Sequence, residues 1–215
     1  MMSEVLIQVE NVSKTIKERT LFSNISLDFK KGEVFHLIGP SGTGKSTFLK
    51  GLVGLVEYSS GKVSYYPHTE NHLTFPEIRS RIHYIGQFNP SYDLKVLDYI
   101  NLVYRLEVYK VKKFDLSELE KYLEYFQFNK DILNKNLNFL SGGELQIIRI
   151  IRSFLLEPEA LLLDEASTAM DGDLKNKFEQ ILQEKVTNGL SLISVSHDIE
   201  HLKRLGGKEL TFNLE

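Results

Sequence analysis

Val34–Thr47 reads VFHLIGPSGTGKST, a short apolar run that passes directly into a glycine-rich loop. Gly39–Ser46 matches the phosphate-binding loop pattern, in which a glycine, four residues and a second glycine precede lysine and serine or threonine. In that pattern backbone N–H groups surround the α- and β-phosphates of a nucleotide, Lys45 reaches the β- and γ-phosphates, and the Ser46 hydroxyl ligates Mg²⁺. A glycine-rich turn without a ligand is the alternative, but a chance match in a chain of this length is on the order of 1%. We therefore expect Val34–Ile38 to be a buried parallel strand that leads into a phosphate-binding loop.

The composition of the chain excludes several classes of protein. With 215 residues, of which 42% are hydrophobic and 26% charged, the sequence is long enough for one sizeable domain and typical of a globular protein. The net charge of −3 argues against a strongly basic nucleic-acid surface, and the lack of cysteine excludes disulfides, thiolate metal sites and thiol nucleophiles. No apolar run approaches the ~20 residues that span a bilayer, and Met1–Glu10 does not have the pattern of a signal peptide. A function at a membrane would therefore require a separate membrane partner.

Two kinds of periodicity divide the chain. Val5–Val9 and Ile25–Phe29 alternate with period two, which predicts sheet, whereas Asp93–Asn138 places its apolar residues at helical spacing. Further strands are expected at Val63–Tyr66, Ile82–Ile85, Ala160–Leu163 and Leu190–Val195. The pattern indicates an α/β nucleotide-binding core with a helical lobe inserted at roughly residues 89–138.

Two carboxylates follow the apolar run Ala160–Leu163. Ligands of open α/β sheets bind beyond the carboxyl ends of the strands, which is where Asp164 and Glu165 would lie. Taken alone, such a pair is usually a solvated turn. Beside a phosphate-binding loop, Asp164 is expected to hold Mg²⁺ through water and Glu165 to polarise the attacking water as general base.

A second helix start has an unusual composition. Ser141 and Glu144 have the spacing of a capping box, yet Gly142 and Gly143 occupy the first turn, where each is expected to cost up to about 1 kcal/mol relative to alanine. A helix start without side chains lets backbone N–H groups approach an anion such as phosphate. The chain thus has two phosphate-binding features.

The segment Leu140–Glu144 resembles the signature motif of the ATP-binding cassette family, and Glu144 stands twenty positions before Asp164, as in that family. The resemblance covers almost the whole chain. It implies an α/β P-loop NTPase (RecA-like) core with an antiparallel β subdomain and an inserted α-helical subdomain. We expect one cassette domain over residues 1–215, with the core at 1–88 and 139–215 and the helical subdomain at about 89–138. It also implies that two cassettes pair head to tail, so that the signature of one caps the γ-phosphate held by the other.

The same resemblance assigns roles to further positions. Gln87 matches the family's glutamine loop, Asp171 ends a loop through which the subunits touch, and His197 matches the switch histidine that contacts the γ-phosphate. The resemblance makes Glu165, His197 and Lys45 catalytic, and Ser46, Gln87 and Asp164 the metal-binding residues. The residues expected to bind nucleotide are Gly39, Pro40, Ser41, Gly42, Thr43, Gly44, Lys45, Ser46, Thr47, Gln87, Ser141, Gly142, Gly143 and Asp171. His68 and His72 are four apart, but they follow Pro67 in a polar stretch, so exposed side chains are expected there rather than a metal site.

The sequence departs from the family pattern in three places. Ile16 stands where the family usually stacks an aromatic residue on the adenine, so GTP is expected to compete with ATP. Ile147 replaces an arginine that commonly follows the signature, and Ala166 replaces the proline after the Asp-Glu pair.

The function implied by the resemblance is ATP hydrolysis that drives transport. The expected cofactors are ATP and Mg²⁺, and the expected partners are a second copy of the chain and an integral-membrane permease at the cytoplasmic face of the cell membrane, with no nucleic acid. A groove for a cytosolic helix of the permease is expected just after Gln87, from Tyr92, Leu94, Val96, Tyr99 and Tyr104, although the same residues would also suit the lobe's own core.

Other functions remain open at this point. A cassette ATPase that acts on a soluble assembly has the same motifs, whereas a P-loop kinase would leave Leu140–Glu144 unexplained. The compact chain also resembles the stand-alone ATPases of small bacterial exporters, including an iron-export type. The transported substance and its direction do not follow from these motifs.

Overall fold

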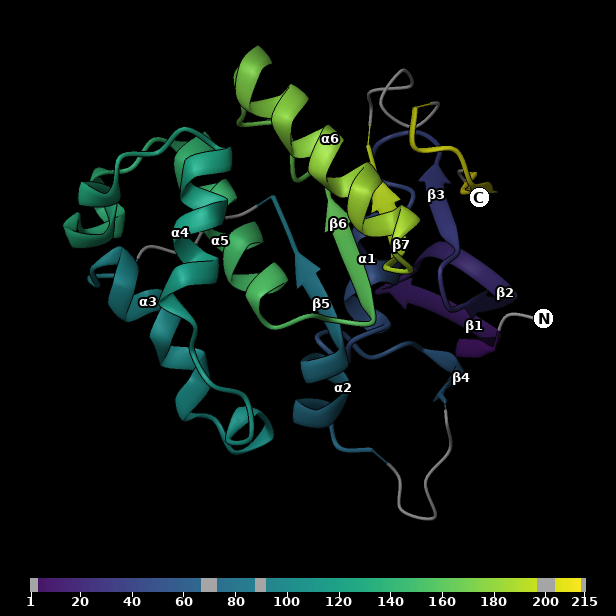
Figure 1. Ribbon diagram of the computed structural model, residues 1–215. Coiled ribbons are helices and arrows are strands. Elements are labelled where there is room, and N and C mark those ends of the chain that lie inside the picture. Colours follow the sequence, from purple (N-terminus) through teal and green to yellow (C-terminus); the bar gives the residue numbers. More distant parts are fainter. Residues whose placement is uncertain (1–3, 67–72, 88–91, 197–203, 214–215) are drawn as a thin grey trace.

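The computed structural model describes residues 4–66, 73–87, 92–196 and 204–213. Its strands form two sheets (Figure 1). The antiparallel sheet has the order β2-β1-β4, made of β1 (Val5–Ile16), β2 (Arg19–Lys30) and β4 (Ser60–Tyr65). The parallel sheet has the order β5-β6-β7-β3-β8, made of β3 (Val34–Ile38), β5 (Ile82–Ile85), β6 (Ala160–Asp164), β7 (Ser191–Val195) and β8 (Lys208–Thr211). Both sheets agree with the α/β fold class expected from the sequence.

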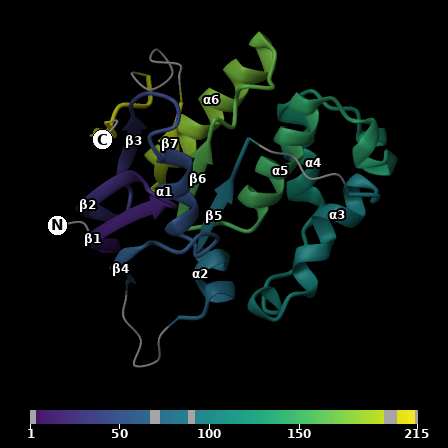
Figure 2. The same ribbon diagram turned by 180° about the vertical axis from the view of Figure 1, so that it is seen from behind.

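The helices are α1 (Lys45–Gly51), α2 (Phe75–Arg81), α3 (Val96–Leu102), α4 (Leu116–Tyr125), α5 (Gly142–Leu155) and α6 (Gly172–Thr187). Four 3-10 segments accompany them: η1 (Val103–Arg105), η2 (Glu107–Tyr109), η3 (Lys130–Asn134) and η4 (Leu137–Phe139). Figures 1 and 2 show α3 and α4 on one side of the parallel sheet and the antiparallel sheet on the other. The helical lobe therefore joins the molecule at the β5 edge, next to α5.

Two apolar clusters cover the opposite faces of the parallel sheet. Successive side chains of a strand point to opposite faces, so Leu161 and Leu163 pack toward α5 and α6, whereas Leu162 packs toward α1 and the antiparallel sheet. Full burial on both faces explains why the sequence of β6 is apolar from Ala160 to Leu163.

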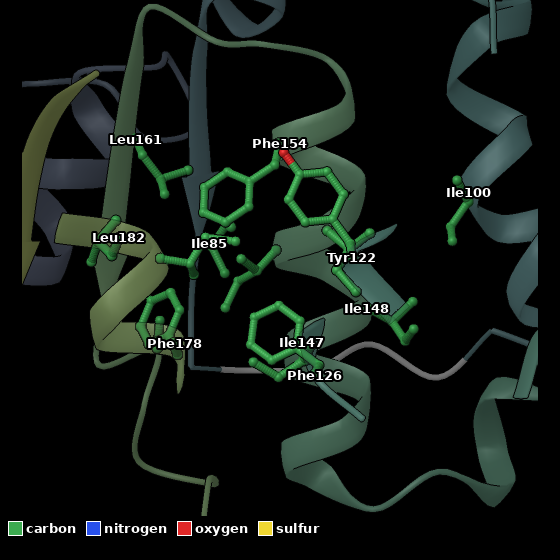
Figure 3. Packing of buried hydrophobic residues seen from close by; sticks show 14 of the residues in the cluster. Ile85, Ile100, Tyr122, Phe126, Ile147, Ile148, Phe154, Leu161, Phe178 and Leu182 are labelled. Carbon is green, nitrogen blue, oxygen red and sulfur yellow. The ribbon is translucent and has the colours of Figure 1, made fainter. Parts of the chain in front are cut away.

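Helix α5 lies at the centre of the first cluster. Ile147, Ile148 and Phe154 extend from it toward Tyr122 of α4 and Phe178 of α6 (Figure 3). Ile147 is 0% exposed and packs within the apolar core, where the charge of an arginine would need a partner. Ala166 is also buried against this cluster.

A series of hydrogen bonds links the core to the lobe at His83 of β5. Its Nδ1 lies 2.7 Å from the Ser153 hydroxyl of α5, and its Nε2 lies 2.9 Å from the Tyr109 hydroxyl of η2. Burial, reinforced by the nearby charge of Arg152, lowers the pKa of His83 to about 4. The imidazole is therefore neutral at physiological pH and holds three elements together by hydrogen bonds.

This pKa makes the fold sensitive to mild acid. Because the pKa of His83 falls from 6.5 in the unfolded chain to about 4 in the folded one, its stabilising effect is complete above pH 6.5 and is lost as the pH falls toward 4. Between pH 7.5 and pH 5 we expect His83 to account for a loss of about 2 kcal/mol in the free energy of unfolding. Urea titrations of the wild type and His83→Gln at both pH values measure this loss. Equal pH dependence in the two proteins would contradict it, since every other titrating group is common to both.

Candidate nucleotide-binding site

The phosphate-binding loop connects β3 to α1, as the sequence predicts. Gly39 has φ +138° and Gly44 has φ +95°, conformations that favour glycine, and a Cβ on Gly39 would lie 2.1 Å from the Phe212 carbonyl oxygen. Lys45 Nζ donates to the carbonyl oxygens of Gly39 and Pro40, each at 2.7 Å. Burial lowers the pKa of Lys45, against the opposing effect of the Glu165 and Asp164 carboxylates.

A cavity of about 230 Å³ opens above this loop. It is lined by Leu21, Ser41, Gly42, Gly44, Lys45, Ser46, Thr47 and Glu165. Six of these eight residues were expected to bind nucleotide, and Glu165 was expected to act on water at its γ-phosphate. The β1–β2 hairpin completes the wall with Leu21, and Arg19 Nη2 donates to the Gly42 carbonyl oxygen at 3.2 Å.

Asp164 ends β6 with its side chain buried at 4% exposure. One carboxylate oxygen accepts a hydrogen bond from the Ser46 hydroxyl at 2.8 Å, and the other accepts from the Tyr84 hydroxyl at 2.8 Å. Burial and the bond to Asp164 raise the pKa of Tyr84, which therefore remains a donor. The structure thus places Ser46 and Asp164, two of the metal-binding residues predicted from the sequence, in direct contact.

Glu165 turns away from the strand at this point. Its backbone has φ +53°, a left-handed conformation that is uncommon for a residue other than glycine, and its N–H donates to the Val195 carbonyl oxygen at 3.0 Å. Strained backbone of this kind clusters at functional sites. Gln87 Nε2 donates to Glu165 Oε2 at 3.3 Å, so the predicted glutamine lies beside the predicted base.

The signature segment lies in a different environment from the phosphate-binding loop. Ser141 caps α5, its hydroxyl accepts from Glu144 N–H at 3.2 Å, and its own N–H donates to Glu144 Oε2 at 2.7 Å, which confirms the capping box. A Cβ on Gly143 would lie 2.8 Å from the Ala169 carbonyl oxygen, so packing within the chain explains this glycine. Gly142 is exposed, and a Cβ there would make only an ordinary 3.4 Å contact. In the part of the chain that the structure describes, none of Ser141, Gly142 and Gly143 lines the cavity above the phosphate-binding loop.

The structure describes two of the remaining predicted positions, Asp171 and Ile16. The Asp171 carboxylate caps α6 by accepting from Leu174 N–H at 2.9 Å. His197 lies outside the described residues, as do His68 and His72. Ile16 ends β1 with 49% of its surface exposed.

Sequence reasoning missed Tyr84 and Leu21. Tyr84 is one aromatic residue on a short strand, and the 80 positions that separate it from Asp164 leave no local signal of their contact. Leu21 lines the cavity because the β1–β2 hairpin folds over the loop, which depends on tertiary structure.

Comparison with known proteins identifies the family. The model of the ABC transporter family matches residues 22–168, a range that contains the phosphate-binding loop, the signature and the Asp164–Glu165 pair. The chain belongs to the ABC transporter family. It is therefore an ATP-binding and ATP-hydrolysing cassette.

Three relatives illustrate the range of the match. The ergothioneine transport ATP-binding protein of Helicobacter pylori is 31% identical over 95% of this chain and 96% of its own length. The molybdate/tungstate import ATP-binding protein of Methanocaldococcus jannaschii is 30% identical over 94% of this chain, which spans 66% of that longer protein. A dimeric structure of an ATP-binding cassette in a post-hydrolysis state, bound to ADP and phosphate, is similar with a TM-score of 0.81 at 25% identity, covering 98% of this chain and 97% of that one.

Ile16, at the exposed end of β1, and Leu21, which lines the cavity, lead to a prediction about base selectivity. Base–aromatic stacking contributes about 1–3 kcal/mol, and these two aliphatic residues do not supply it. GTP is therefore expected to compete with ATP within roughly tenfold, about 1.4 kcal/mol. Displacement of a fluorescent ATP analogue by ATP and GTP measures the ratio.

Two variants sharpen this experiment. Ile16→Tyr is expected to raise the affinity for ATP by about tenfold, whereas Glu10→Tyr, at another exposed position of β1 that does not line the cavity, should leave it unchanged. A thousandfold preference of the wild type for ATP would contradict the prediction.

Proposed function

We propose that this chain is the ATPase subunit of a membrane transporter, works as an ATP-dependent homodimer with Mg²⁺, and drives a separate membrane-spanning permease from the cytoplasmic face. The observation that carries the proposal is the division of the phosphate-binding features. Lys45, Ser46 and Glu165 line one cavity, with Asp164 bonded to Ser46 behind it, while the exposed start of α5 at Gly142 does not line it. A second copy is the partner that would bring such a helix start to this cavity.

The metal site suits magnesium. Mg²⁺ is usually held by one or two carboxylates together with substrate phosphates and waters. The Ser46 hydroxyl and the Asp164 carboxylate would supply two oxygen ligands of this kind beside the phosphate-binding loop. Gln87 would add an amide oxygen. When bound, the ion would neutralise charge on the β- and γ-phosphates.

The protein's own residues perform the remaining steps. The loop N–H groups and Lys45 hold the phosphates, and Lys45 exchanges its bonds to Gly39 and Pro40 for the β- and γ-phosphates. Glu165 accepts a proton from the attacking water, and Gln87 orients that carboxylate. The partner's Ser141 and Gly142 would close the site over the γ-phosphate, and the loss of that phosphate would release the two subunits.

Removal of the base tests this arrangement. Glu165→Gln is expected to bind ATP, to hydrolyse it about 10²–10⁴-fold more slowly, and to accumulate as a dimer in gel filtration with Mg²⁺ and ATP. In that background Gly142→Glu should abolish the dimer, because a carboxylate at this position repels phosphate. The fold should persist, since the position is exposed and acidic residues suit a helix start.

Leu116→Glu is the matched control for this experiment, because Leu116 is the first residue of α4 and is 46% exposed. It should leave the Glu165→Gln dimer intact. A purely monomeric Glu165→Gln protein at saturating ATP would contradict the homodimer.

A groove at the boundary between core and lobe supports the permease as partner. Among the described residues no helix is both long and apolar enough to span a membrane. The groove has a volume of about 530 Å³, larger than the cavity at the phosphate-binding loop, and apolar side chains such as Leu55 and Leu106 form much of its wall. These two leucines are 50% and 52% exposed. Exposed apolar surface of this kind marks interaction sites.

The charge of the groove favours one kind of segment. Arg79, Arg149 and Arg152 line it, and Glu107 is the one carboxylate among its lining residues that the structure describes. Glu107 itself pairs with Lys110. The groove therefore suits an amphipathic helix that carries an apolar face and a carboxylate, and a cytosolic helix of the permease is the proposed occupant.

Substitutions in the groove test the partner. In tagged protein purified from its own cells after gentle solubilisation, a multi-spanning membrane protein should accompany the wild type at near-equal stoichiometry. Leu55→Asp or Leu106→Asp should reduce its recovery about tenfold and leave ATP binding intact. Val111→Asp is the control, because Val111 is 83% exposed and does not line the groove. Recovery with soluble companions alone would overturn the transport proposal in favour of a cassette ATPase that acts on a soluble assembly.

A further inference from the structure

Tyr84 joins the groove to the metal-binding carboxylate. Its side chain lines the groove at the boundary of core and lobe, and its hydroxyl donates to Asp164 Oδ2 at 2.8 Å. Ser46 donates to the other oxygen of the same carboxylate. One aromatic side chain therefore touches both the proposed docking surface and the proposed metal site.

Gly86 makes this position of Tyr84 possible. A Cβ on Gly86 would lie 2.7 Å from the Tyr84 hydroxyl oxygen and 2.9 Å from its Cε1, so the phenol occupies the space that any larger residue would fill. The backbone of Gly86 does not require glycine for its own conformation, because its φ lies outside the left-handed region. The glycine is thus explained by the tyrosine that lies over it.

The backbone at Gly86 is also held by α5. Its carbonyl oxygen accepts from Arg149 Nη1 of α5 at 3.1 Å, and Arg149 lines the groove. The next residue, Gln87, donates to Glu165. A displacement of this backbone would therefore move both Tyr84 and Gln87.

We propose that Tyr84 is a positioning residue for Asp164 and that Gly86 leaves the space its phenol needs to reach that carboxylate. The inference rests on the proposed Mg²⁺-dependent function and adds a residue that fixes the orientation of the metal-binding carboxylate. The Ser46 hydroxyl has a second role in the metal site, whereas the Tyr84 hydroxyl serves Asp164 alone among the described contacts. Without this donor, a buried carboxylate oxygen would lose its hydrogen bond and the side chain would lose its fixed orientation.

Tyr84→Phe tests the positioning role with a binding readout. Mn²⁺ serves as the probe, and its affinity is measured by electron paramagnetic resonance in the presence of a non-hydrolysable ATP analogue. The variant is expected to bind Mn²⁺ about tenfold more weakly, while the affinity for the fluorescent nucleotide in excess chelator stays at the wild-type value. Unchanged Mn²⁺ affinity, or an equal loss of metal-free nucleotide affinity, would overturn the proposal.

Tyr65→Phe is the matched control. The Tyr65 hydroxyl donates to the Leu52 carbonyl oxygen at 2.8 Å, so this variant also removes a half-buried hydroxyl that forms a hydrogen bond, but away from Asp164. Its Mn²⁺ affinity should equal that of the wild type. A similar loss in both variants would reduce the effect of Tyr84→Phe to general destabilisation and overturn the positioning role.

Gly86→Ala tests the route from Gly86 through the phenol to Asp164. The added Cβ would push the phenol away from Asp164, so Mn²⁺ affinity should fall as in Tyr84→Phe, and the double variant should be no weaker than either single one. Fully additive losses would overturn the route. Absence of Mn²⁺ binding in the wild type would instead refute the proposed metal function, so the two failures are distinguishable.

Discussion

The Asp164 carboxylate receives hydrogen bonds from two parts of the chain that lie far apart in sequence. Ser46 approaches it from the start of α1 and Tyr84 from β5, each at 2.8 Å. This convergence depends on the parallel sheet, which brings the carboxyl ends of β3, β5 and β6 to one edge. The order β5-β6-β7-β3 therefore determines which side chains can meet the phosphate-binding loop.

The two glycines of the signature have different physical explanations. Gly143 is required by the Ala169 carbonyl oxygen of the same chain, so its lack of a side chain reflects internal packing. Gly142 is exposed and has no such contact below 3.4 Å. It is Gly142, next to the capping hydroxyl of Ser141, that leaves an accessible helix start, and in the proposed dimer this start would face the phosphate held by the other subunit.

The strongly patterned parts of the fold could be predicted from the sequence. The phosphate-binding loop, β3 and the carboxylates after β6 follow from local composition, because glycine conformation and continuous apolar runs leave few alternatives. The groove could not be placed in this way. Of the residues expected to form it, Val96 and Tyr99 are 0% and 3% exposed and belong to the core, and none of the expected set lines the groove that the structure describes. Helical spacing shows that a helix has an apolar face, but not whether a neighbouring element covers that face.

In the proposed dimer two copies assemble head to tail around ATP, and the chain's lack of cysteine allows a direct measurement of that geometry. Glu18→Cys, next to Arg19, which bonds to the phosphate-binding loop, and Phe139→Cys, which is 82% exposed beside the signature, would each carry one fluorescent label in the Glu165→Gln background. Energy transfer between differently labelled copies in a mixture measures their separation. We expect strong transfer between labels at positions 18 and 139 that appears only with Mg²⁺ and ATP. Transfer that is independent of ATP, or stronger between two Phe139 labels than between Glu18 and Phe139, would contradict the head-to-tail dimer.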